Sequence, residues 1–232
     1  MKEESTMIKG LLSEDWRKLQ LAVIDFETTG LDSTKDRIVE YGIAYFDNGK
    51  FINVRSNLVN PEMKLSEEVI KIHGITNEEL EKADTFFQQY WMIEDFLTGR
   101  IPVAYNASFD RAFFHAEINR LCKHANFYSP SYVDLPAFWC ETWIDPLVWI
   151  RHFFKYEKSK KLTSICKKLD IKLENAHRAA SDAEAAGKVL FALQNKLPFT
   201  YGELISKQTR LAEEQERDYQ NWKQRQKKEI QK

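Results

Sequence analysis

The stretch LQLAVIDFETTG, residues 19–30, decides the fold, because an apolar strand ends there in two acids one residue apart. Side chains alternate across a strand, so Asp25 and Glu27 project from one face and Phe26 from the other. Carboxylates this close repel each other, and one of them resists ionisation unless a cation neutralises the pair. Magnesium or manganese, which prefer oxygen ligands, would fill this role. Taken alone, the pattern also fits a polar strand end. Other residues of the chain must therefore show whether the two acids bind a metal ion.

Two more strands are expected directly after this one, in RIVEYGIAYF (residues 37–46) and KFINVRSNL (residues 50–58). Asp47-Asn48-Gly49 supplies the turn between them, so the first three strands form an antiparallel meander. The next segment, SEEVIKIHGITNEELEKA, predicts short helices on both sides of Gly74, because Thr76 and Glu79 have the spacing of a capping box.

Strand and helix then alternate, which is typical of an α/β sheet with helices packed on it. The expected elements are a helix at 85–97, a strand at 101–105, a helix from about Ser108, and helices at 162–169 and 179–194. The aromatic-rich region 127–156 is expected to be helical in its second half and to supply core side chains, although aromatic residues can also stack on bases.

The domain organisation follows from a change in composition after Pro198. We expect an N-terminal extension (1–18), one α/β domain (19–198) and a charged helical tail (199–232) that is appended to the domain and lies outside its core. Basic residues near the end of the tail would either hold phosphates or form a solvated helix end: Lys223, Arg225, Lys227 and Lys228.

Composition excludes several classes of protein. Hydrophobic residues make up 43% of the 232 residues, which is enough for a substantial core. No apolar run approaches the roughly 20 residues that cross a bilayer, and the start lacks the apolar stretch of a signal peptide, so we expect no membrane partner and a soluble, cytoplasmic protein. The three cysteines match no zinc or redox spacing, and a formal charge of −1 does not decide for or against nucleic acid.

Two further acids and a histidine strengthen the metal hypothesis. Asp110 begins the helix that follows the strand at 101–105, where a helix dipole would also favour it. Asp182 shares a helix face with apolar residues that should pack on the sheet, and a buried carboxylate needs a cation or strong hydrogen bonds. His177 stands just before the same helix, and imidazole suits a general base near neutral pH.

With DFETTG, YNASFD and HRAASD in this order, the chain resembles the DEDDh branch of the DnaQ-like 3′–5′ exonucleases, over roughly residues 19–197. The resemblance implies a ribonuclease-H-like fold, with a mixed central sheet of three antiparallel strands followed by parallel strands and helices on both faces. It also implies two Mg²⁺ or Mn²⁺ ions, one held by Asp25, Glu27 and Asp182 and the other by Asp25 and Asp110. His177 would accept a proton from the attacking water.

The same resemblance suggests residues that hold the 3′-terminal nucleotide. The main chain near Thr28 and the side chains of Phe26, Asn106 and Phe109 belong to this set, although Phe26 and Phe109 also fit core positions. His73 lies in an H-G-I segment similar to that of proofreading subunits, and it also fits a histidine at a helix C-terminus. Tyr105 departs from the histidine common in related sequences, which puts the subfamily in doubt.

Three alternatives concern the substrate and the partners. The H-G-I segment and the NASFD wording favour a DNA 3′ end, preferably single-stranded, while RNA-trimming exonucleases share the fold and the acids. Gln194, Leu197 and Phe199 resemble the Q-x-x-L-x-F peptide that docks on sliding clamps, and the same residues also fit a helix end followed by a proline. A polymerase-associated proofreading subunit therefore stays open.

Overall fold

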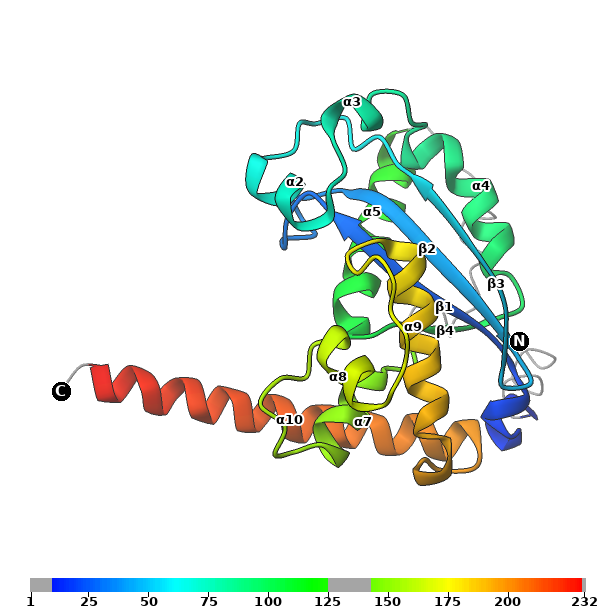
Figure 1. Ribbon diagram of the computed structural model, residues 1–232, viewed down its shortest axis with the longest axis vertical. Helices are drawn as coiled ribbons and strands as arrows, with labels where there is room; N and C mark the ends of the chain where they lie inside the picture. Colours follow the sequence, from blue (N-terminus) through cyan, green and yellow to red (C-terminus); the bar gives the residue numbers. More distant parts are fainter. Residues whose placement is uncertain (1–9, 125–142, 231–232) are drawn as a thin grey trace.

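A computed structural model describes residues 10–124 and 143–230 and centres on a four-stranded mixed sheet of order β3-β2-β1-β4 (Figure 1). The strands are β1 (Gln20–Thr28), β2 (Ile38–Asp47), β3 (Lys50–Leu58) and β4 (Ile101–Val103). The helices are α2 (Glu67–His73), α3 (Asn77–Leu80), α4 (Phe86–Leu97), α5 (Ala107–His124), α7 (Pro146–Phe153), α8 (Leu162–Lys168), α9 (Ala179–Ala192) and α10 (Tyr201–Ile230), with short 3₁₀ turns η1 (Trp16–Lys18) and η3 (Gln194–Lys196).

The antiparallel meander predicted from the sequence is confirmed. Strand β2 pairs antiparallel with both β1 and β3, and Asn48 and Gly49 take the positive φ values, 50° and 75°, that a tight hairpin turn requires. Strand β4 is parallel to β1 but ends at Val103, two residues earlier than expected, and the backbone N–H of Ala104 donates to the carbonyl of Ile144. The short helices around Gly74 and the Thr76–Glu79 capping box are also present.

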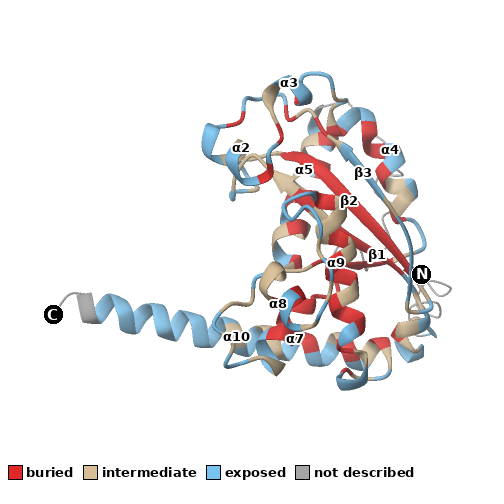
Figure 2. Ribbon diagram, in the orientation of Figure 1, coloured by how far each residue is buried: buried red, intermediate tan, exposed pale blue. Residues whose placement is uncertain are grey.

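Helices cover both faces of the sheet, as predicted (Figure 1). One face of β1, which includes Leu21 and Val23, packs in a core shared with α7, α8, α9 and the start of α10. The other face, which includes Ile24 and Phe26, packs against α4 and α5. The buried residues therefore form two apolar layers around the central strands (Figure 2).

The expectation that the C-terminal segment lies outside the core is wrong for its first turns. Tyr201 and Leu204 are buried in the α9-side core, and Gln208 is also buried. From Glu216 to Lys228 every residue is exposed, and the helix extends away from the body (Figures 1 and 2). Sequence reasoning missed the buried part because only a few apolar residues, widely spaced, mark it.

The proposed N-terminal extension also contributes to the core at its end. Trp16 is fully buried, stacks on Phe191 and donates its indole N–H to the carbonyl of Pro198 at 2.9 Å. The boundaries of the α/β domain therefore stay a prediction, with both flanking segments packed on it.

The aromatic-rich region and the cysteines are only partly within the described residues. Trp143 and Trp149 of the aromatic-rich region are buried, whereas the part at 125–142, with Cys140, lies outside the described residues. Cys122 and Cys166 are free thiols, and burial raises the pKa of Cys166 to about 11.

Across the described parts of the chain, no helix has both the length and the apolar character that a membrane span requires.

Candidate active site

The acids of β1 lie where strand alternation predicts them. Asp25 and Glu27 continue the face of Leu21 and Val23, beneath the start of α9, and are only partly exposed. Phe26 points to the opposite face, where it is 6% exposed and stacks against Phe114. Its side chain therefore has the core position that the sequence left open, and a contact between this side chain and substrate stays a prediction.

Asp110 joins α5 to the acidic end of β1. It lies in the first turn of α5, is 3% exposed, and accepts the backbone N–H of Phe26 at 3.0 Å through Oδ1. This bond crosses 84 residues of sequence, so Asp110 does more than complement a helix dipole: it fixes the distance between α5 and the strand residue next to Asp25.

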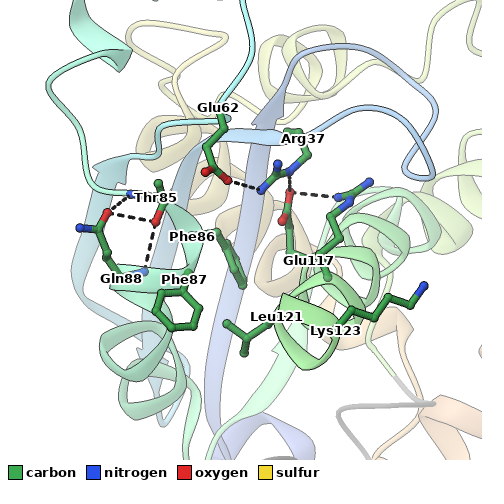
Figure 3. Close-up of a pocket in the computed structure, with 10 residues that line it drawn as sticks. Arg37, Glu62, Thr85, Phe86, Phe87, Gln88, Glu117, Leu121 and Lys123 are labelled. Carbon is green, nitrogen blue, oxygen red and sulfur yellow. Dashed lines mark hydrogen bonds and ion pairs between the residues drawn. The ribbon is translucent and has the colours of Figure 1, made fainter. Parts of the chain in front are cut away.

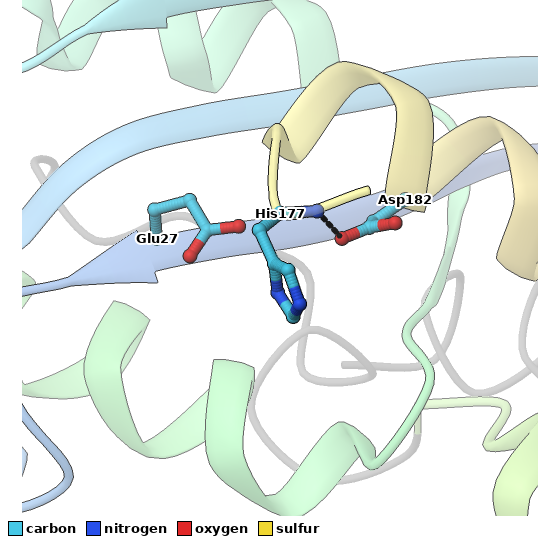
Figure 4. A group of neighbouring side chains, drawn as sticks. All are labelled: Glu27, His177 and Asp182. Carbon is cyan, nitrogen blue, oxygen red and sulfur yellow. Dashed lines mark hydrogen bonds between the residues drawn. The ribbon is translucent and has the colours of Figure 1, made fainter. Parts of the chain in front are cut away.

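Asp182 reaches the same place from α9. Its Oδ2 accepts the backbone N–H of His177 at 3.0 Å, whereas its Oδ1 is buried and has no hydrogen-bond partner within the described residues. Figure 4 shows Glu27 on β1 facing His177 and Asp182, which come from the beginning of α9. One potential ligand atom from each of these three residues lies within 4.8 Å of the others, a spacing that a metal ion could bridge.

The electrostatics of the site follow from this crowding. Burial raises the pKa of Asp25 well above its usual value, and the neighbouring Asp110 and Asp182 raise it further. Burial also raises the pKa of Asp110 and, together with Asp182 and Glu40, raises the pKa of Glu27 to about 7. The pKa of Asp182 is raised by burial and lowered in part by the His177 N–H. Four carboxylates that share one place and resist ionisation, one with a buried unpaired oxygen, fit divalent cations.

A buried glutamate that sequence reasoning missed holds α9 in position. Glu40 of β2 is 2% exposed and pairs in register with Glu27. It accepts hydrogen bonds from the Arg178 guanidinium, the shortest at 2.7 Å, and from the backbone N–H of Ala179 at 3.0 Å. The signal was present, because Glu40 is a charged residue inside the apolar run RIVEYGIAYF.

A glycine lets α9 approach the sheet closely beside this pair. Gly42 is the register partner of Asp25, and a Cβ atom at this position would lie only 2.1 Å from the carbonyl oxygen of Ala179. Any side chain here would push the start of α9 away from β2. Gly42 and Glu40 together therefore set the height of Asp182 and His177 above the acids of β1.

The N-terminus of α5 has its own support, which sequence reasoning also missed. Asn106 takes a left-handed conformation with φ of 74°, and the backbone N–H groups of Asn106 and Ala107 donate to Asp145, each at 3.0 Å. The N–H of Asp145 donates in turn to Gln208 Oε1 of α10 at 2.8 Å. Asp145 lay in the half of the aromatic-rich region that was expected to be helical and matched no motif, so only the structure reveals its role.

The other residues predicted to bind substrate, His73, Thr28 and Phe109, lie in different environments. His73 is 6% exposed, its Nδ1 accepts the N–H of Ile75, and its buried Nε2 has no partner within the described residues. Burial lowers the pKa of His73, and the charges of Glu40, Arg178 and His177 act on it, which places it beside the site. Thr28 donates its hydroxyl to the carbonyl of Gly30, and Phe109 is half-buried against Phe113.

A cavity of about 570 Å³ opens beside His177 and Asp182 and also touches Asn106. Its other lining residues include three basic ones, Arg151, Lys160 and Lys161. A larger pocket of about 690 Å³ lies between α4 and α5 and is lined by Phe86, Phe87 and Leu121 (Figure 3). There the buried Glu117 pairs with Arg37 at 2.7 Å, so the described residues of that pocket include no comparable set of unpaired acids.

The possible clamp-binding peptide does not present its central side chain. Leu197 is 9% exposed and belongs to the α9-side core, whereas Phe199 is exposed beneath the guanidinium of Arg17. Gln194 lies in η3, directly after α9. This arrangement supports the alternative interpretation, a helix end followed by a proline.

Comparison with known proteins matches this geometry to a family. A family model described as "Exonuclease" (RNase_T) matches residues 22–190. The DNA polymerase III PolC-type of Bacillus cereus is 34% identical over 168 residues, and that of Lacticaseibacillus paracasei is 29% identical over 188 residues. These matches cover 72% and 81% of this chain but only 11% and 12% of the relatives, so the chain spans about a tenth of their length.

Solved structures share the fold. Exonuclease X in complex with 5′ overhanging duplex DNA matches with a TM-score of 0.61 and 22% identity, over 81% of this chain and 99% of that one. The nuclease domain of 3′hExo, a DEDDh family member bound to rAMP, matches with a TM-score of 0.60 and 19% identity, over 76% and 92% of the two chains. With the family model covering all the acids and His177, this chain belongs to the exonuclease family.

Proposed function

We propose that the protein is a metal-dependent 3′–5′ exonuclease that removes nucleotides from the 3′ end of DNA, preferably from single strands. The observation that carries the proposal is the convergence of Asp25, Glu27, Asp110 and Asp182 with His177, next to a cavity that His177 and Asp182 line. A purely structural role does not explain why these carboxylates pair with no cationic side chain among the described residues, whereas the buried Glu40 and Glu117 each pair with an arginine.

The acids fit a pair of divalent cations, magnesium or manganese. Asp25, Glu27 and Asp182 would hold one ion, and Asp25 with Asp110 would hold the other. When bound, such ions stabilise the attacking and the leaving oxygens of an in-line phosphoryl displacement. The buried, unpaired Oδ1 of Asp182 is the oxygen that most needs a positive partner.

His177 is placed to move the proton. Its backbone N–H is held by Asp182, and its imidazole is exposed at the cavity, so the ring is oriented without being buried. The neutral ring accepts a proton from the attacking water, whose oxygen bonds to phosphorus. The bond from phosphorus to the 3′ oxygen of the preceding nucleotide then breaks, and a nucleoside 5′-monophosphate leaves.

The preference for DNA rests on similarity. One solved neighbour was obtained with duplex DNA and the sequence relatives are DNA polymerases, although another neighbour holds rAMP. We propose DNA as the main substrate and RNA as the alternative. Similarity to a segment of PolC-type polymerases also favours a proofreading role beside a polymerase, which co-purification with a replicative polymerase would test.

Digestion of 5′-labelled oligonucleotides tests the proposal directly. Single-stranded DNA, duplex DNA and RNA of the same sequence are incubated with magnesium, manganese or a chelator. A ladder that shortens from the 3′ end, faster on single-stranded DNA and absent with chelator, is the expected result. Cleavage that does not need metal, or products with a 3′-phosphate, would refute the mechanism.

A further inference from the structure

A second groove leads from the active site to the C-terminal helix. It has a volume of about 580 Å³ and is bounded on one side by Ala212, Gln215, Glu216 and Tyr219 of α10. Asn106 and Arg151 line both this groove and the cavity beside His177 and Asp182. The two hollows are therefore neighbours, with Arg151 at the passage between them.

Arg151 has the properties of a phosphate contact at this passage. Its side chain is exposed, and it forms no ion pair with any carboxylate in the described ranges 10–124 and 143–230. Asp145, which also lines the groove, already accepts the N–H groups of Asn106, Ala107 and Leu147. The guanidinium is thus available to an anion that enters from the catalytic side.

The groove ends at an exposed aromatic pair. Tyr219 and Trp222 are stacked, with ring centroids 6.0 Å apart and an interplanar angle of 17°. They are 47% and 55% exposed, and the ammonium of Lys223 lies 4.5 Å from the centroid of the Tyr219 ring. Exposed rings next to basic side chains form the usual platform on which bases of a single strand stack.

The position of α10 at the groove is fixed, not incidental. Gln208 of α10 is hydrogen-bonded to the backbone of Trp143 and Asp145, and Gln215 donates to the carbonyl of Val148 at 2.9 Å. The Oε1 atom of Gln215 is buried at the groove and has no partner within the described residues. Beyond this point the helix leaves the body and exposes its rings (Figure 1).

We propose that the strand 5′ of the cleaved nucleotide passes Arg151 and stacks its bases on Tyr219 and Trp222, so that α10 is a strand-holding arm. This inference rests on the proposed function, since it concerns the same substrate. Glu216 also lines the groove, so stacking supplies more of the affinity than charge does. Strands too short to reach the rings gain nothing from the arm.

The test compares substrate length in the full-length protein. We expect the double substitution Tyr219→Ala/Trp222→Ala to lower kcat/KM on a single-stranded 20-mer by about 10- to 100-fold relative to a trimer, through KM, as expected for the loss of base stacking. Tyr219→Phe/Trp222→Phe keeps both rings and should keep the wild-type ratio. Equal losses on both lengths, or an unchanged ratio in the alanine variant, would overturn the proposal.

A binding measurement separates this inference from the proposed function. Fluorescence anisotropy of labelled oligo(dT) of 3 and 20 nucleotides, in chelator, reports affinity without hydrolysis. If wild type cleaves nothing yet binds the 20-mer through the rings, the proposed activity fails and the arm stands. If wild type cleaves and the alanine variant binds as tightly, the arm fails. A change in sedimentation with unchanged affinity would instead identify a surface for self-association and overturn the arm.

Discussion

The molecule contains two sets of buried carboxylates that differ in how they are satisfied. Glu40, Asp145 and Glu117 each have donors close by: the Arg178 guanidinium, the N–H groups at the start of α5, or the Arg37 guanidinium. The second set, Asp25, Glu27, Asp110 and Asp182, lies together at the candidate active site, and burial raises the pKa of each of its members. Neighbouring acids raise the pKa values of Asp25 and Glu27 further. The first set holds helices to the sheet or to each other. The acids of the second set repel one another when they are ionised, and a bound cation would reduce this repulsion.

Removing an acid of the second set should produce the largest loss of activity. Asp25→Asn or Asp182→Asn removes a predicted metal ligand, so hydrolysis in magnesium should become undetectable while the fold persists. Apo stability should stay equal or rise, because the substitution removes repulsion. Circular dichroism and thermal melting check the fold. Asp47→Asn, which weakens a partly buried ion pair with Arg100 outside the candidate site, serves as the control and should keep its activity.

Replacement of His177 should cost less. We expect His177→Ala to lower kcat by about 10² to 10⁴, the usual cost of a lost general base. Stabilisation by magnesium, measured as the shift in Tm, should survive. A parallel loss of magnesium stabilisation and activity would instead assign His177 to metal binding.

Within the first set, Glu40 should affect both stability and activity, whereas Glu117 should affect stability alone. Glu40→Gln removes charged hydrogen bonds to Arg178 and Ala179, which should lower the free energy of unfolding by about 1.5–3 kcal/mol. It should also reduce kcat, by about 10-fold, because a displaced α9 misplaces Asp182 and His177. Glu117→Gln is the matched control, since Glu117 is equally buried and pairs with Arg37 on the other side of the sheet.

The Glu117→Gln control also shows whether a loss of activity in Glu40→Gln is specific to α9. If Glu117→Gln loses stability and activity to the same extent as Glu40→Gln, general loosening explains both, and the special role of Glu40 in holding α9 is wrong. Both variants should therefore be assayed well below their melting temperatures, with Tm recorded for each.

The pH dependence of stability should show the smallest effect. The folded-state pKa values of Asp25, Glu27, Asp110 and Asp182 are raised, to about 7 for Glu27, so the metal-free fold holds protons more tightly than the unfolded chain. Metal-free protein should lose stability as pH rises from about 4 to about 7. Magnesium should restore it at pH 7.5 and do little at pH 5. Subtracting the profile of Asp25→Asn isolates this contribution, and identical profiles would contradict it.

The sequence predicted the second set of acids better than the first. Asp25, Glu27, Asp110 and Asp182 stand in short patterns at strand ends and helix starts, where local periodicity determines their direction. Glu40 has its partner 138 residues away, so no local pattern connects the two. For such residues the sequence shows only a charge in an apolar run, and the reason for that charge lies in another element.

The same distinction explains the error at α10. The charged, glutamine-rich composition after Pro198 predicted the helix, but its packed turns are marked by only a few side chains, such as Tyr201 and Leu204. The buried contact of Gln208 is polar, and a glutamine in a charged, glutamine-rich segment carries no signal of burial. Removal of all residues after Thr200 would therefore expose core surface, whereas a cut after Arg217 would spare it.

The chain of hydrogen bonds from Gln208 through Asp145 to Asn106 and Ala107 makes the base of α10 and the start of α5 one mechanical unit. Regions joined in this way open together, so their amide protons should exchange with solvent at a common rate set by a shared opening. Asp110, at the start of α5, would then become mobile whenever the base of α10 opens, although Asp110 does not contact α10. Release of the C-terminal helix would loosen the acid that faces Asp25, so the fold itself makes the order of the catalytic centre depend on the seating of its last helix.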